Sequence, residues 1–158
     1  MALQQVFMEP VTAQTQTKTT GLDLGTLRYE GSKIYQYIYN SGGAAIAADY
    51  GCRLSGTGGY SATVTSTVNE HIAFGIAESA ISATAYGWVL KKGITTFIAE
   101  ANTSFAVGER LVLGTDGAFY SGSGISAIVY SALVCGECLS AMATAAGSAL
   151  GYFNFMRS

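Results

Sequence analysis

The residues best suited to chemistry are three cysteines and one histidine. Cys135 and Cys138 form a CxxC pair, while Cys52 and His71 lie elsewhere in the chain. A structural zinc site commonly needs four ligands in paired motifs, and this chain carries only half of that pattern. A redox CxxC would need a βαβ setting, which the sequence does not provide. We therefore expect buried free thiols, and neither a metal nor a cofactor.

Hydrolytic chemistry has little support either. A Ser/His/Asp arrangement could be built only around His71, and no nucleophile-elbow pattern accompanies it. The ten acidic residues are scattered singly, so no catalytic pair of carboxylates stands out. The glycine-rich stretch 55–60 lacks the lysine and the following helix of a phosphate loop, and it favours a hairpin. The sequence predicts that the protein is not an enzyme.

The composition points to an unusual surface. The chain has 158 residues, enough for one domain or two small half-domains that share a core. Charged residues make up 11% of it and the net charge is −2, whereas an average soluble domain has about 25% charged residues. We expect neither a nucleic-acid nor a membrane partner. Either hydroxyls and small residues form the exterior, or neighbouring subunits of an assembly cover it.

The N-terminal residues 1–26 differ from the rest of the chain. They show no signal-peptide pattern, and no stretch of the sequence reaches the roughly 18 apolar residues that span a bilayer. Residues 9–26 are rich in Thr and Gln and lack apolar periodicity, which is typical of an extended arm. Leu3, Val6 and Phe7 could dock this arm on a neighbouring subunit, or the arm could fold back on its own domain.

Residues 27–158 read as a β domain. Segment 34–39 is rich in strand-forming residues and ends at an Asn-Ser-Gly-Gly turn. Segment 111–120 reads as a hairpin with Asp-Gly near its tip, because these residues tolerate positive φ. Further strands are predicted at 125–135 and 151–156. The fold class that we expect is all-β, a small sandwich or barrel-like domain.

The β domain also repeats itself, in units of about 27–88 and 89–155. Two copies are too few for a solenoid but enough for a pseudo-symmetric sandwich or barrel with a shared core. Small residues near the ends of the segments would then let strands approach closely. The matches are Ile34, Tyr37 and Ile38 with Ile94, Phe97 and Ile98 at an offset of sixty, Arg53-Leu54 with Arg110-Leu111, and Gly75 with Gly136.

Four blocks of sequence carry a resemblance to a known family: LGTLRYEGSKIYQYIYNSGGAAIAADYG, GIAESAISATAYGWVLKKG, VGERLVLGTDG and ALVCGECLSAMATAAGSALGYFNF. Their order resembles the small capsid decoration (cement) proteins of tailed bacteriophages, which attach to the outside of the icosahedral head. The resemblance implies an all-β fold, self-association as a homotrimer, and the major capsid protein as partner. It also implies a place on the outer surface of the virion capsid, after assembly in the host cytoplasm.

The function expected from this resemblance is to bind the outer surface of an assembled capsid and to stabilise or decorate it. Trp88, beside Tyr86, stands where related chains show a Gly-Trp pair, and could anchor either the barrel core or a subunit contact. Three tyrosines alternate along segment 34–39, on a face that is either an interface or solvent surface. The interface candidates are Leu3, Val6, Phe7, Tyr35, Tyr37, Tyr39, Tyr86 and Trp88.

Two other functions remain open at this point. A head-fibre or tail-associated structural protein would share the β fold and the arm, but would be present at low copy number. A β-rich module that binds host glycans or receptors would use the tyrosine face, and should bind sugars when detached from any particle. The sequence does not separate these alternatives.

Overall fold

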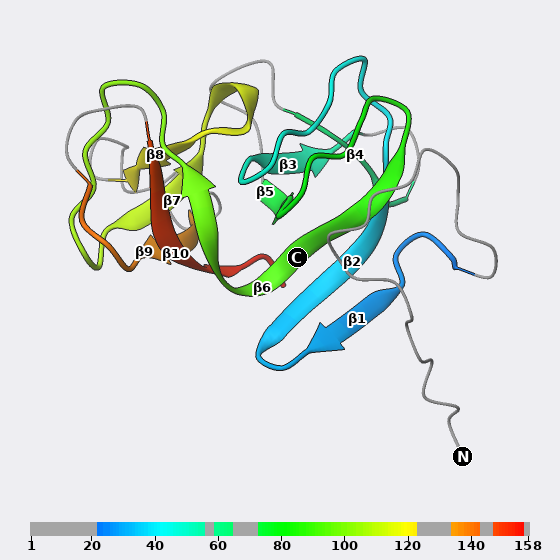
Figure 1. Ribbon diagram of the computed structural model, residues 1–158, viewed down its shortest axis with the longest axis horizontal. Helices are drawn as coiled ribbons and strands as arrows, with labels where there is room; N and C mark the ends of the chain where they lie inside the picture. The colour runs from blue at the N-terminus through cyan, green and yellow to red at the C-terminus, as the bar shows by residue number, and fades with distance from the viewer. Residues whose placement is uncertain (1–21, 56–58, 65–72, 123–133, 143–146, 157–158) are drawn as a thin grey trace.

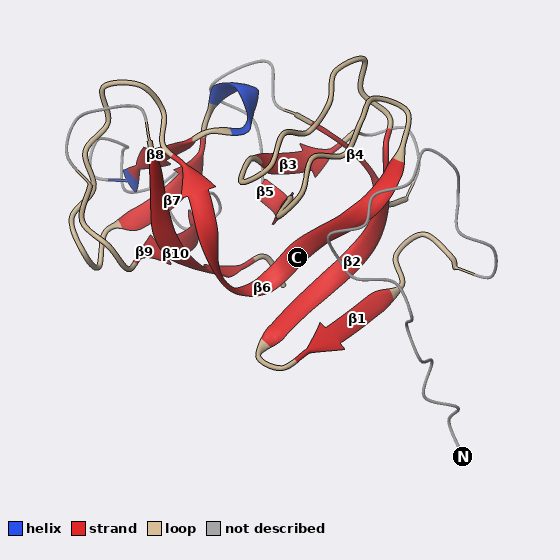
Figure 2. Ribbon diagram, in the orientation of Figure 1, coloured by secondary structure: helices blue, strands red, loops and turns tan. Residues whose placement is uncertain are grey.

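The computed structural model describes residues 22–55, 59–64, 73–122, 134–142 and 147–156. Regular structure in these ranges is nearly all strand (Figure 2), which confirms the all-β, barrel-like fold class. The elements are β1 (Leu27–Glu30), β2 (Lys33–Asn40), β3 (Gly51–Leu54), β4 (Ser61–Thr63), β5 (Ala73–Ile76), β6 (Tyr86–Ile98), β7 (Arg110–Leu113), the 3-10 turn η1 (Thr115–Gly117), β8 (Phe119–Ser121), β9 (Val134–Cys138) and β10 (Ser148–Asn154).

The first half of the chain closes into a five-stranded barrel. The strand order is β2-β4-β3-β5-β6, and β6 pairs back with β2 to complete the ring. Strand β2 is parallel to β4 and antiparallel to β6. Small and β-branched side chains fill the interior, including Ile38, Ile46, Cys52, Ile81 and Val89. The edge strand β1 adds to β2 outside the ring.

The second half forms a similar ring on the continuation of β6. Its strand order is β6-β10-β9-β7-β8, and a parallel bridge between Ala99 and Phe119 brings β8 back beside the end of β6. We call this ring the second barrel. Its interior is aromatic: Phe97 makes edge-to-face contacts with Phe119 and Phe153 at ring-centroid distances of 5.6 and 5.9 Å. Figure 1 shows the two barrels side by side, with β6 running from one to the other.

The two barrels have equivalent hydrogen bonds. In the first barrel Ile46 and Ile81 exchange two backbone hydrogen bonds, of 2.9 and 2.8 Å, and in the second Phe105 and Met142 do the same at 3.0 and 2.9 Å. Likewise the N–H of Asp49 donates to the carbonyl of Ala77, as the N–H of Gly108 donates to that of Cys138. The chain therefore makes one pattern of strand pairing twice.

The register of the repeat differs by one from the offset of sixty in the sequence alignment. Ile46 and Asp49 stand 59 positions before their equivalents Phe105 and Gly108. The same offset pairs Ile38 with Phe97, both fully buried. An offset of sixty would pair Ile38 with Ile98, which is partly exposed. A slip of one residue turns a strand's side chains to the opposite face, so the buried positions fix the offset at 59 for this part of the repeat.

The strand pairings also change the match of Arg53-Leu54 with Arg110-Leu111 that the sequence alignment gave for β3 and β7. A register irregularity lies between Cys52 and Arg53 in β3, and the corresponding one lies between Leu111 and Val112 in β7. Cys52 is therefore the structural equivalent of Leu111. Gly75 and Gly136, opposite these irregularities, are equivalent as the sequence alignment had them.

The second barrel packs against the outside of the first. A Cβ atom at Gly51 would lie 2.3 Å from Leu113 Cδ1 and 2.8 Å from Phe119 Cζ, and one at Gly117 would lie 2.6 Å from the carbonyl oxygen of Gly51. Glycine is needed at both positions because any side chain would collide across this contact. Asp49 adds a hydrogen bond between the two barrels, because its carboxylate accepts from Thr96 Oγ1 at 2.7 Å.

The locally coded elements follow the sequence predictions. The strand at 34–39 is β2, and the hairpin at 111–120 is β7-η1-β8, with Asp116 at φ 53° and Gly117 at φ 86°. Both predictions are confirmed. The strand at 151–156 begins three residues earlier and ends at Asn154. Of the strand at 125–135, residues up to 133 lie outside the described residues, and β9 begins at Val134.

The structure bears on two predicted boundaries, the division between the repeats and the end of the N-terminal arm. The division between repeats at 88/89 falls inside β6, whose 13 residues serve both barrels. Of the predicted arm at 1–26, residues 1–21 lie outside the described residues. In the remainder, Leu22 is buried and the N–H of Gly25 donates to the carbonyl of Tyr37 at 2.8 Å. This part of the chain therefore runs alongside β2.

Candidate interaction surface

The cysteines are buried in the two barrels. Cys135 Sγ donates a hydrogen bond of 3.2 Å to the carbonyl of Leu111, and Cys138 Sγ donates one of 3.0 Å to that of Ser140. Burial raises the pKa of Cys52 and of Cys135 to about 12, so both are protonated thiols at neutral pH. The described ranges contain no group of three or more residues that could hold a metal ion. His71 lies outside the described residues.

Glu78 pairs with polar groups of two strands, β2 and β6. Lys33 Nζ lies 2.5 Å from Glu78 Oε1, and Tyr35 Oη donates to Glu78 Oε2 at 2.6 Å. Burial raises the pKa of Glu78, but hydrogen bonds from Lys33, Tyr35 and Thr95 outweigh burial and hold the pKa below its usual range. These side chains form hydrogen bonds and an ion pair with one another, as expected of a network that stabilises the fold.

The predicted tyrosine face lies largely in the core. Tyr35, Tyr37 and Trp88 are only 3%, 2% and 5% exposed. The rings of Tyr37 and Trp88 are 5.1 Å apart, and the guanidinium of Arg28 from β1 lies over Trp88 at 5.8 Å from its ring centre. For Tyr35 and Tyr37 this corrects the expectation of an interface or solvent surface. Trp88 is a buried residue of the hydrophobic cluster that also contains Tyr35 and Tyr37, on the face of β6 opposite to Val89 and the interior of the first barrel.

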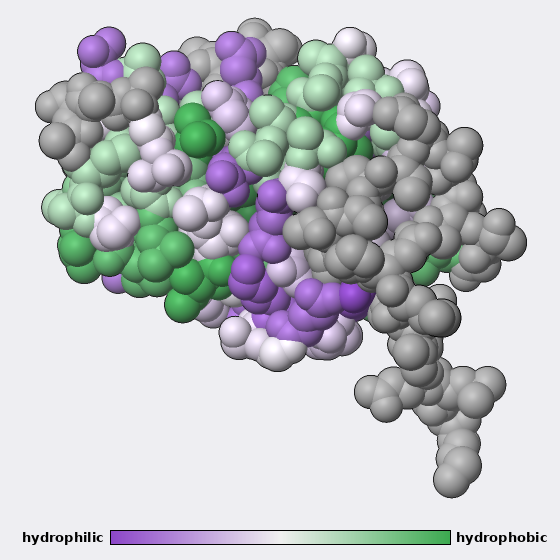
Figure 3. Space-filling model, in the orientation of Figure 1, coloured by the Kyte–Doolittle hydropathy of each residue, from purple (hydrophilic) through white to green (hydrophobic). Residues whose placement is uncertain are grey.

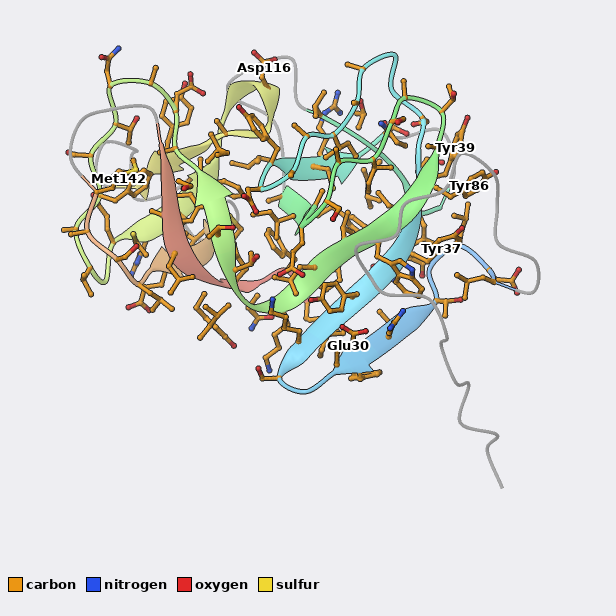
Figure 4. The ribbon with its side chains drawn as sticks, viewed as in Figure 1. Glu30, Tyr37, Tyr39, Tyr86, Asp116 and Met142 are labelled. Atoms are coloured by element: carbon orange, nitrogen blue, oxygen red, sulfur yellow. The ribbon has the colours of Figure 1, made fainter. Side chains whose placement is uncertain are left out.

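The remaining interface candidates fall into two groups. Tyr39 and Tyr86 are partly buried, with ring centres 4.9 Å apart, and Figure 4 shows them beside Tyr37 at one end of the first barrel. Leu3, Val6 and Phe7 lie outside the described residues.

The second barrel carries an apolar surface that the sequence analysis missed. Large hydrophobic side chains are exposed on adjacent strands: Ile94 of β6 is 46% exposed, Leu150 and Tyr152 of β10 are 39% and 36% exposed, and Leu139 after β9 is 36% exposed. Figure 3 shows hydrophobic side chains gathered over this side of the molecule. We call the residues Ile94, Thr96, Arg110, Glu137, Leu139, Leu150 and Tyr152 the outer face of the second barrel.

The register of the strands places these side chains in rows. Arg110, Glu137, Tyr152 and Ile94 are successive partners across β7, β9, β10 and β6. The charges of Arg110 and Glu137 occupy one end of this row, and the apolar side chains occupy the other. A shallow cleft of about 310 Å³ runs along the charged end, next to Tyr152 and Asn154. Large exposed apolar patches mark sites of protein interaction.

One signal in the sequence could have revealed this surface. Residues 148–154 alternate between buried Ala149, Gly151 and Phe153 and exposed Leu150 and Tyr152. An ordinary surface strand is apolar on one face and polar on the other. Here both faces are apolar, which indicates a second contact on the outside of the strand.

Fold and site together describe an all-β protein made of two pseudo-equivalent barrels, with an exposed apolar face on the second. No protein-family model and no curated protein sequence matches the chain. Among solved structures, the chain is similar to the N base of head fiber gp8.5 in bacteriophage phi29. The identity is 14% and the TM-score 0.52, over 77% of this chain and 95% of that one. This likeness shows a shared fold.

No helix in the described ranges combines the length and the apolar character needed to cross a membrane.

Proposed function

We propose that this protein is a structural component of a tailed-phage head, which binds the outer surface of the assembled capsid as a homotrimer and stabilises or decorates it. The observation that carries the proposal is the exposed outer face of the second barrel in a chain with so few charges. An exposed apolar patch of this kind is typical of a surface that contacts another protein, and a scarcity of charge favours association. The resemblance to decoration proteins and the fold shared with a phage head-fiber base support the choice of a phage head.

Repetition would supply the affinity. Each contact can be modest, because a trimer that engages several capsid subunits makes its later contacts intramolecular and gains orders of magnitude in avidity. A standard protein interface buries about 1,600 Å² in total. Such contacts across the seams between capsid subunits would oppose the outward pressure of packaged DNA. Heads saturated with the protein should therefore rupture at a higher temperature than heads without it, and unchanged rupture would remove the stabilising role.

The copy number of the chain in the virion tests the proposal most directly. Quantitative mass spectrometry of gradient-purified virions gives its ratio to the major capsid protein. A ratio near one places the protein across the whole lattice, as decoration requires. Absence from the virion would overturn the proposal.

A second candidate is the base of a head fibre, and the structural likeness to a head-fiber N base favours it specifically. A fibre base would be present in fewer copies and would carry a longer partner. A low copy ratio in the same experiment, with a second protein released together with this one, would select this candidate.

A further inference from the structure

The cleft at the charged end of the outer face of the second barrel has the size of a small ligand site. Its volume is about 310 Å³, at the lower end of the roughly 300–1,000 Å³ that ligand sites occupy. Its lining comes from adjacent strands, with Arg110 from β7, Glu137 from β9, and Tyr152 and Asn154 from β10. Strands hold side chains in place more firmly than loops do, so these four groups can act together on one ligand.

The charges of the cleft balance. Arg110 and Glu137 are partners across β7 and β9, and they are the two charged side chains in the described lining. A strongly anionic ligand would be repelled by the carboxylate of Glu137, and a cationic ligand would be repelled by the guanidinium of Arg110. One charge of each sign in the same cleft therefore favours a neutral ligand that carries both hydrogen-bond donors and acceptors.

The polar side chains of the cleft keep hydrogen-bonding groups available. Within the described part of the chain, neither the guanidinium of Arg110 nor the carboxylate of Glu137 takes part in an ion pair. A Cβ atom at Gly108 would lie 3.7 Å from Glu137 Oε1, so the absence of a side chain there leaves the carboxylate accessible. The side-chain oxygen of Asn154 accepts a hydrogen bond of 3.3 Å from the N–H of Met156, and its Nδ2 group keeps two donors for a ligand.

Tyr152 supplies an aromatic surface next to these polar groups. It is partly exposed, and its ring forms no aromatic pair within the described part of the chain. The face of an aromatic ring carries partial negative charge and attracts polarised C–H groups, which cover one face of a sugar ring. The edges of the same sugar ring carry hydroxyl groups that both donate and accept hydrogen bonds. An exposed ring beside balanced polar side chains matches this ligand on both counts.

We propose that this cleft binds a neutral saccharide unit. The ring of Tyr152 stacks on the apolar face of the sugar, the carboxylate of Glu137 accepts hydrogen bonds from hydroxyl groups, and Arg110 and Asn154 donate to hydroxyl oxygens. The cleft binds the sugar without hydrolysing it, because glycoside hydrolysis commonly uses two carboxyl groups and the described lining contains one. The proposal goes beyond capsid binding and does not rest on it.

The first barrel shows that the fold does not require these residue types. By the strand pairings, Gly51, Ile76 and Leu90 of the first barrel stand at the positions that Arg110, Glu137 and Tyr152 occupy in the second. All three residues of the first barrel are buried. The same strand pairing therefore forms with small and aliphatic residues at these positions. The charged pair and the aromatic ring belong to the open surface of the second barrel, where a ligand can reach them.

Several such sites would act together on a surface that carries many sugars. A shallow cleft with one aromatic ring binds a single sugar weakly, since few contacts offset the lost freedom of the ligand. Several copies of the protein held together would make the later contacts intramolecular and raise the combined affinity by orders of magnitude. Detection therefore needs a probe that presents many sugars at once.

A printed glycan array tests the proposal with the full-length protein. The probes are neutral, sialylated and sulfated oligosaccharides, and circular dichroism confirms that each variant is folded. We expect the wild type to bind neutral oligosaccharides, and Tyr152→Ala and Glu137→Gln each to weaken that binding by about tenfold or more. Tyr29→Ala is the matched control, because it removes a ring that is 68% exposed on the edge strand β1. This control should bind as the wild type does.

Three results would overturn the proposal. The wild type could bind no neutral oligosaccharide on the array, it could bind only sialylated or sulfated probes, or the two cleft variants could bind as well as Tyr29→Ala does. If Tyr152→Ala fails to fold, Glu137→Gln decides the outcome, because it keeps the size of an exposed side chain and removes only its charge. None of these results involves a capsid, so the proposed function is tested separately by the copy number in virions.

Discussion

Glu78 is a polar side chain that connects two segments of the first barrel. It accepts hydrogen bonds from Lys33 and Tyr35 of β2, and it lies two residues after the end of β5 in the chain. The same carboxylate raises the pKa of Tyr35 further, after burial, which is the larger cause. One carboxylate therefore holds the start of β2 against the segment that follows β5.

Replacing Glu78 by Gln should destabilise the protein by about 1–3 kcal/mol at pH 7, because the charge-assisted hydrogen bonds to Lys33 and Tyr35 are lost. The native pKa of Glu78 is below its unfolded value, so its contribution is complete above the unfolded pKa. The contribution disappears as the pH falls through the native pKa. Urea titrations of both proteins from pH 7 to pH 3 should show the difference shrinking. A difference of constant size would contradict the assignment.

Lys91 is a buried amine in the wall of the first barrel. It is 5% exposed, its Nζ donates to the carbonyl of Phe74, and it lies 3.4 Å from the centre of the Phe74 ring. Leu90 of the first barrel is equivalent to Tyr152 of the second, so the next residues, Lys91 and Phe153, are equivalent too. Lys91 therefore places an amine where the second barrel has a core aromatic ring. Burial lowers the pKa of Lys91 to about 8.

The pH dependence of stability should reveal this amine. Between pH 8 and about 10.4 the unfolded state binds a proton at Lys91 that the native state has lost, so stability rises with pH. Relative to Lys91→Met, the wild type should gain up to about 3 kcal/mol across this interval. Urea unfolding at pH 7, 8, 9 and 10 measures the difference between the two proteins. A flat difference would mean that Lys91 titrates normally.

At the scale of elements, two glycines determine how closely the barrels approach. Gly51→Ala should cost about 1–3 kcal/mol, because the new methyl group overlaps Leu113 and Phe119 and forces strands β3 and β7 apart. Gly43→Ala is the matched control, since a Cβ atom there meets nothing within 4 Å and its φ is not positive. We expect the control to stay within about 0.5 kcal/mol of wild type in urea unfolding. Equal effects at both glycines would contradict the close contact.

Local signals account for the elements that the sequence predicted well. The hairpin at 111–120 follows from Asp116 and Gly117, whose positive φ values its turn requires. Strand β2 follows from its β-branched and aromatic residues. The burial of Tyr35 and Tyr37 could not be predicted in this way. Alternation shows that the two rings share a face, but the groups that cover this face, among them Leu22, Arg28 and Glu78, come from other segments of the chain.

The repeat was visible in the sequence, but its register was not. Low-complexity composition lets Ala, Ser and Gly match at several offsets. The buried pair Ile38 and Phe97 selects an offset of 59 once the barrels are formed. The exposed outer face of the second barrel was missed for a related reason. Leu150 and Tyr152 differ from core residues only in lacking a cover, which depends on the arrangement of the barrels.

At the scale of the whole molecule, the shared strand β6 should make both barrels unfold together. Trp88 lies on the part of β6 that pairs with β2 in the first barrel, and Cys135 and Cys138 lie on β9 of the second, although the three side chains belong to one hydrophobic cluster. Neither barrel can close without β6, and the contact at Gly51 couples them further. In a Cys52→Ala variant, Trp88 fluorescence would report on the first barrel and thiol accessibility on the second. We expect one urea midpoint for both signals, as a two-state transition requires. Two separated midpoints would show that the barrels are independent folding units, joined by β6 but not stabilised by it.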